Sequence, residues 1–147
     1  NKKFGNYVKH IYPPELNVEK ANRSDDQANY LDLTFIINTN KKLSTKLYDK
    51  RDDFNFHIVN FPFMSSNIPS GPSYGVYISQ LIRYARCCTY YDDFGYRHKL
   101  LVDRLLSQGY KAPRLRNTFK KFYGRYPDLI TKYQKSVREM VSDSFPM

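Results

Sequence analysis

The feature that most constrains the fold is a change of hydrophobic period near Pro72. Between Tyr30 and Tyr48, apolar and polar residues alternate as they do along β-strands. After Pro72, apolar residues recur every three or four positions, as they do along α-helices. Pro62 and Pro69 separate the two patterns and forbid a long helix between them. Strands followed by helices predict an α+β fold, with a small antiparallel β-hairpin followed by a bundle of about four α-helices.

The same patterns give approximate bounds for the elements. The hairpin strands are expected over 30–37 and 43–48, with Leu31, Leu33, Phe35 and Ile37 on one face. Helices are expected over about 72–91, over about 94–108 with a stop at Gly109, from 112 onward, and over about 129–142. The chain is thereby divided into an irregular connector (1–29), the hairpin with an aromatic loop (30–71) and a basic helical region (72–147) with a frayed end over 143–147.

The charge balance indicates an anionic partner. The chain carries 24 Lys and Arg against 14 Asp and Glu, a formal net charge of +10. In the last third, cations meet almost no acid, and tyrosines and phenylalanines are interleaved with them. Cations bind phosphates and exposed rings can stack on bases, so this pattern favours duplex or hybrid nucleic acid over a solvated basic face above an aromatic core. The predicted phosphate contacts here are Lys111, Arg114, Arg116, Lys120, Lys121 and Arg125.

Two acidic clusters invite a catalytic interpretation that their surroundings do not favour. Tyr90-Tyr91-Asp92-Asp93 looks like a polymerase metal site, but its flanks are helical and basic rather than apolar strands. The helix dipole explains the two carboxylates better, as the first turn of a helix. The aspartates between residues 49 and 53 alternate with Lys50 and Arg51, which favours salt pairing. We therefore predict no catalytic residue and no metal site in this chain.

The cysteines and the hydropathy bear on compartment and chemistry. Cys87 and Cys88 are adjacent, a poor geometry for a mutual disulfide, and no apolar run approaches the roughly 20 residues that cross a bilayer. A reducing intracellular compartment, nucleus or cytoplasm, is expected, with no membrane partner and no small-molecule substrate. A thiol hydrolase using one of these cysteines with a distant histidine is a less favoured alternative, since no orienting third group is visible. A first residue other than Met suggests a fragment or a processed piece.

The order of short motifs between Tyr30 and Tyr110 resembles a known family. The chain is similar to the part of retroelement reverse transcriptases, of Penelope-like or related non-viral elements, that follows the catalytic palm. The motifs, in order, are Tyr30-Leu31-Asp32-Leu33, the stretch 45–56, Ser66-Asn67-Ile68-Pro69, the stretch 80–86, and Gln108-Gly109-Tyr110. Asp49-Lys50-Arg51-Asp52 stands where relatives have Arg-Lys-Pro-Thr, and Ile68 stands where they have His.

This resemblance implies a role for each region. The hairpin would be similar to the strands that grip the primer end, and the helices to the thumb that closes over the template-primer duplex. By position, Lys50, Arg51 and Asn55 would match the primer-side strand and loop, and Arg83 and Arg86 the helix beside the duplex. The catalytic aspartates and their magnesium would lie in an upstream palm, so this chain alone would bind an RNA-DNA hybrid and copy nothing. The alternative is a free-standing basic helical module, for example a domesticated remnant of such an element, that binds nucleic acid or an acidic protein.

Overall fold

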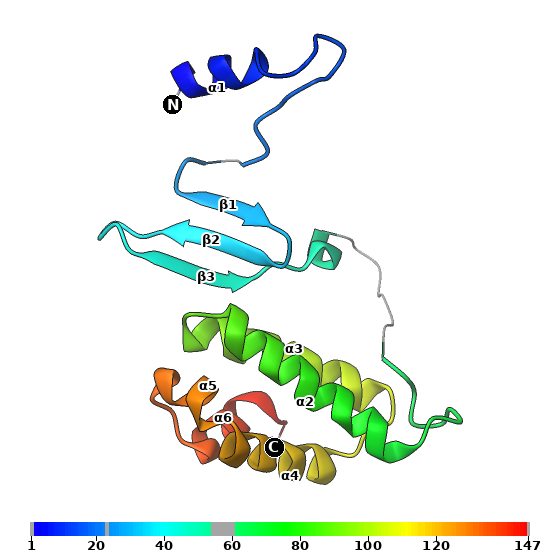
Figure 1. Ribbon diagram of the computed structural model, residues 1–147. Helices are drawn as coiled ribbons and strands as arrows, with labels where there is room; N and C mark the ends of the chain where they lie inside the picture. The colour runs from blue at the N-terminus through cyan, green and yellow to red at the C-terminus, as the bar shows by residue number, and fades with distance from the viewer. Residues whose placement is uncertain (1, 23, 54–60, 147) are drawn as a thin grey trace.

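A computed structural model of the 147-residue chain describes residues 2–22, 24–53 and 61–146. Figure 1 shows a short N-terminal helix at one end, a small sheet in the middle and a helical bundle at the other end. The elements are α1 (Lys2–Lys9), β1 (Gln27–Tyr30), β2 (Leu33–Ile37), β3 (Leu43–Leu47), η1 (Lys50–Asp53), α2 (Ser70–Cys87), α3 (Tyr91–Ser107), α4 (Ala112–Arg125), α5 (Pro127–Ile130), η2 (Thr131–Tyr133) and α6 (Val137–Ser144). The predicted α+β class is confirmed.

The sheet has one strand more than the predicted hairpin. It is antiparallel in the order β1-β2-β3, with Phe35 opposite Ala28 on one side and Thr45 on the other. The strand expected to begin at Tyr30 is instead broken by a turn at Leu31, whose φ of 53° lies in the left-handed region. Leu31 is consequently 77% exposed, so its predicted place on the apolar face with Leu33 is wrong.

The sheet meets the bundle along its β3 edge. The Thr45 backbone N–H donates to the Thr89 hydroxyl and the Thr89 N–H donates to the Thr45 carbonyl, each at 2.9 Å. Leu47, at the end of β3, is buried in the common core. The connection between α2 and α3 thus occupies the outer edge of β3, which protects that edge from pairing with another chain.

The three long helices of the bundle follow the predicted signals. Gly109, with φ of 92°, ends the turn after α3, and Pro113 lies in the first turn of α4. The apolar faces of α2, α3 and α4 meet in one core, which contains the fully buried residues Tyr77, Leu81, Phe94, Leu101, Leu105, Leu115, Phe119 and Phe122.

The predicted fourth helix is interrupted. α5 continues into η2, which ends before Gln134, and this residue adopts the left-handed conformation with φ of 53°. α6 then begins with a capping box, in which the Ser136 hydroxyl accepts from the Glu139 N–H and the Glu139 carboxylate accepts from the Ser136 N–H. The frayed end predicted over 143–147 is wrong at Ser144 and Phe145, which are buried against the bundle, and Met147 lies outside the described residues.

The irregular connector predicted for 1–29 contains α1 and most of β1. Every residue of β1 is exposed, so no apolar alternation marks it as a strand. Among the aromatic residues expected to anchor the loop, Phe61 is buried and Phe63 is 47% exposed, while Phe54 and Phe56 lie outside the described residues. No helix in the described ranges is long and apolar enough to cross a membrane.

Candidate nucleic-acid interface

The strongest concentration of unopposed charge is on α4. Its sequence from Ala112 to Arg125 contains five cations and no carboxylate. Figure 1 shows α4 on the side of the bundle away from the sheet. Leu115, Phe119 and Phe122 are fully buried and attach one face of this helix to the core. The opposite face therefore carries positive charge into solvent along the whole helix.

The cations of α4 fall into two rows. At 100° per residue, Arg114, Lys121 and Arg125 project within a narrow arc, and Arg116 and Lys120 project along a second row on the other side of the exposed face. All are exposed except the half-buried Arg116. The first row spans about 17 Å at 1.5 Å of rise per residue. A duplex presents one phosphate charge per roughly 1.7 Å of its axis, so a row of this length faces many phosphates at once.

The rings interleaved with these cations point into the protein rather than toward solvent. Phe119 and Phe122 are buried, and Tyr126 is half-buried with its ring centroid 5.5 Å from that of Phe122. The Tyr123 hydroxyl donates to the Lys135 carbonyl at 2.8 Å. These rings are therefore not placed to stack on bases, and the face offers charge alone.

Arg114 is the cation of α4 with the closest ring contact. Its guanidinium carbon lies 4.1 Å from the centroid of the Tyr74 ring, which is buried. The Tyr74 hydroxyl accepts a hydrogen bond from the Lys111 backbone N–H at 3.0 Å. The same tyrosine therefore contacts both Arg114 and the residue that precedes α4, Lys111, whose side chain is exposed.

The predicted primer-side residues have different surroundings. Arg51 forms a two-pronged ion pair with Asp49, with the closest nitrogen and oxygen 2.6 Å apart. The hydrogen bond from Arg51 lowers the pKa of Asp49 to about 2, so this pair is ionised at neutral pH and part of the Arg51 charge is offset. The salt pairing predicted for this aspartate is confirmed. Lys50 is exposed, and Asn55 lies outside the described residues.

The two predicted arginines of α2 also differ from each other. Arg83 forms an ion pair with Asp32, in the turn between β1 and β2, at 3.3 Å. Arg86 is exposed in the last turn of α2. η1 lies beside the sheet and α4 lies on the far side of the bundle (Figure 1). The structure thus brings together the six residues from Lys111 to Arg125 and separates them from Lys50 and Arg51.

The carboxylates of α3 and the thiols at the end of α2 have structural surroundings. Asp92 and Asp93 lie in the first turn of α3, as the helix-dipole interpretation predicts. No group of three or more His, Cys, Asp or Glu able to hold a metal ion occurs among the described residues. Cys88 is fully buried, and burial raises the pKa of its thiol, which disfavours the nucleophilic thiolate.

The sequence patterns gave no sign of the burial of His98. This residue has no exposed surface, its Nε2 lies 2.6 Å from the Tyr77 hydroxyl, and its ring stacks on Phe119 with centroids 4.7 Å apart. Burial lowers the pKa of His98 to about 3. Its position four residues after Phe94 and three before Leu101 places it on the buried face of α3, and this helical spacing could have assigned it to the core.

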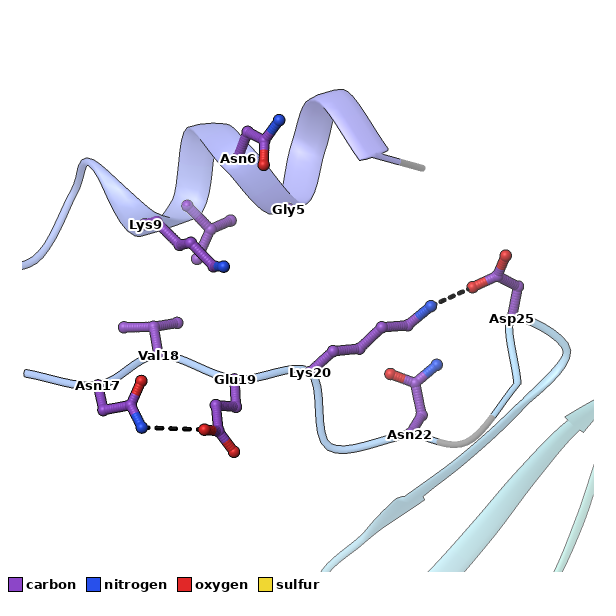
Figure 2. A pocket seen from close by; sticks show the side chains of 10 residues that line it. Gly5, Asn6, Lys9, Asn17, Val18, Glu19, Lys20, Asn22 and Asp25 are labelled. Atoms are coloured by element: carbon purple, nitrogen blue, oxygen red, sulfur yellow. Dashed lines mark hydrogen bonds and ion pairs between the residues drawn. The ribbon is translucent and has the colours of Figure 1, made fainter.

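A cleft lies beside α1, far from α4. Figure 2 shows a cleft of about 860 Å³ between α1 and the segment from Asn17 to Asp25. Four of the polar residues that line it are paired, since the Asn17 amide donates to Glu19 and Lys20 binds Asp25.

Comparison of the chain with known protein families, with curated proteins and with solved structures found no match.

Proposed function

We propose that this chain binds nucleic acid through the exposed face of α4. The observation that carries the proposal is the set of five cations without a single carboxylate, on a helix whose rings are turned inward. Such a face attracts the phosphate backbone by releasing its counterions and does not read base sequence.

Within this proposal, the chain acts as the thumb and connection portion of a retroelement reverse transcriptase. A small sheet followed by a basic helical bundle is the order that this role requires, and the motif order between Tyr30 and Tyr110 supports it. The palm, with its aspartates and magnesium, would be a separate upstream partner, and the duplex would be the template-primer hybrid. The location would be intracellular, in nucleus or cytoplasm, which is consistent with two free cysteines.

A free-standing module that binds an acidic protein is the second candidate. The observation that favours it is the number of large apolar side chains exposed in the first third of the chain, among them Tyr7, Ile11, Leu16, Tyr30 and Leu31. Exposed apolar side chains that lie close together mark protein interfaces more often than nucleic-acid interfaces.

The deciding experiment compares two pairs of adjacent lysines. Binding of the chain to an RNA-DNA hybrid, to duplex DNA and to heparin would be measured across a salt series. The variant Lys120→Gln/Lys121→Gln removes two charges from α4, and the matched control Lys41→Gln/Lys42→Gln removes two exposed charges from the turn between β2 and β3.

We expect binding that weakens steeply with salt, and a slope of log affinity against log salt that is smaller by about 2 in the α4 variant. The control should keep the original slope. Equal slopes in both variants, or no binding at low salt, would exclude α4 as a phosphate-binding face. Binding to an acidic polypeptide but to neither duplex would favour the second candidate.

A further inference from the structure

The N-terminal end of α4 holds one arginine in a defined position. The Arg114 guanidinium carbon is 4.1 Å from the Tyr74 ring centroid, which is within the range of a cation–π contact. The ring itself is held on two sides. Its hydroxyl accepts from the Lys111 N–H at 3.0 Å, and the Tyr110 ring lies at 5.1 Å between centroids. Tyr110 is buried and its hydroxyl donates to the Pro62 carbonyl, so the platform beneath Arg114 is part of the core.

The other cations of α4 have no comparable support. The side chains of Arg116, Lys120 and Lys121 make no hydrogen bond, ion pair or ring contact with the residues that the structure describes. Arg125 lies 5.7 Å from the centroid of Tyr126, a half-buried ring in the adjacent position. Each of these side chains therefore loses rotamer freedom when it binds a phosphate, whereas Arg114 has lost part of it beforehand.

Arg114 also keeps its donors available. Among the described residues, no carboxylate pairs with it and no acceptor takes a hydrogen bond from its guanidinium, so its N–H groups remain available. A guanidinium can present two parallel N–H donors to two phosphate oxygens, which an ammonium group cannot do.

We propose that Tyr74 is a positioning residue that holds Arg114 for a two-pronged contact with a backbone phosphodiester, and that this contact is the strongest on the α4 face. This inference rests on the proposed nucleic-acid binding and goes beyond it, because charge alone would make all cations of the face equivalent. Its chemical signature is a requirement for arginine at 114 and for an aromatic ring at 74.

The first test is a pair of charge-conserving substitutions. Arg114→Lys keeps the charge and loses both the stacking and the two-pronged geometry, and Arg116→Lys is the matched control on the same helix without a ring contact. We expect Arg114→Lys to weaken binding of the hybrid roughly threefold to tenfold, the range that follows from the ordering of one long side chain. Arg116→Lys should change affinity less than twofold. Equal effects of the two substitutions would overturn the inference.

The second test is a double-mutant cycle through Tyr74. Tyr74→Phe keeps the ring and should preserve affinity, whereas Tyr74→Leu should weaken binding in the wild-type background and have no further effect in Arg114→Lys. A structural loss would instead weaken binding equally in both backgrounds, and thermal unfolding of each variant shows whether the bundle is intact. Should Tyr74→Leu unfold the chain, the comparison of Arg114→Lys with Arg116→Lys still decides the question.

The failures of the two proposals are distinguishable. If the wild-type chain binds no hybrid at low salt, nucleic-acid binding itself is wrong. The wild-type chain could instead bind the hybrid with a salt dependence that Lys120→Gln/Lys121→Gln reduces. If Arg114→Lys then binds as tightly as the wild type, only the role of Tyr74 and Arg114 is wrong.

Discussion

At the scale of the residue, His98 shows how burial changes the chemistry of a side chain. The imidazole is enclosed by aromatic rings, and its Nδ1 has no hydrogen-bond partner in the described structure. Because burial disfavours the charged form, the folded-state pKa of about 3 lies below the ordinary value of 6.5. His98 therefore costs no stability above pH 6.5, where it is neutral in both states, and destabilises the fold as the pH falls from 6.5 toward 3.

This pKa shift predicts a pH-dependent stability above the range where carboxylates titrate. As the pH falls from 6.5 to 5, the free energy of unfolding should fall with a slope that approaches roughly 1.4 kcal/mol per pH unit, because only the unfolded chain binds the proton. Urea unfolding at several pH values measures it. His98→Leu should flatten the dependence, although it lowers stability overall, and the exposed His10→Gln should leave it unchanged. A slope that survives in His98→Leu would assign the effect to other groups.

At the scale of the element, α6 shows that a local signal can stabilise a helix of only eight residues. Such a short helix is unstable alone, and it is held by the capping box at Ser136 and by the burial of Met140 and Phe145. The Phe145 ring meets His98 edge-on, with centroids 5.7 Å apart, so α6 completes the enclosure of the histidine.

The cap of α6 predicts the cost of its removal. Ser136→Ala deletes the acceptor for the Glu139 N–H and should lower the free energy of unfolding by about 1 kcal/mol. Ser142→Ala, at an exposed position of the same helix, is the control and should change stability by less than half of that. Equal stabilities of wild type and Ser136→Ala, measured by urea titration, would mean that this end of the chain is frayed in solution.

At the scale of the whole molecule, the sheet depends on the bundle more than the bundle depends on the sheet. Among the described residues of the three strands, Leu47 is the apolar side chain buried in the common core. Nearly all other residues of that core belong to the bundle. Because the other buried residues of the strands, Thr34 and Ser44, are polar, the sheet buries little apolar surface of its own. Its order should therefore follow from this attachment and from the paired backbone groups of Thr45 and Thr89.

This asymmetry predicts that substitutions in the sheet and in the bundle core have different effects on stability and hydrogen exchange. Leu47→Ala should lower stability by roughly 2 to 5 kcal/mol where the site cannot collapse. Hydrogen exchange should become faster at the amides of β2 and β3 while α3 keeps most of its protection. Leu101→Ala, in the bundle core, should instead accelerate exchange in both parts. If Leu47→Ala accelerates exchange in α3 and β3 alike, the sheet and the bundle unfold as one unit.

Helix bounds could be predicted from the sequence wherever the conformational limits of single residues set them. The prolines near 62–72, Gly109 and the acidic first turn of α3 placed the long helices within a few residues of their observed bounds. The capping box at Ser136 was equally local and could have separated the last two helices. β1 could not be read, because a strand exposed on every residue has no apolar alternation.

The α+β class, the long helices and the unopposed positive charge of α4 follow from the sequence, because helix propensity, helix-breaking residues and net charge are properties of neighbouring residues. Which groups are free to act depends on tertiary packing. Arg51 and Arg83 are paired with carboxylates, the rings of α4 point inward, and Tyr74 from another helix supports Arg114. Such pairings join residues that are distant along the chain or depend on side-chain direction, so packing rather than sequence pattern sets them.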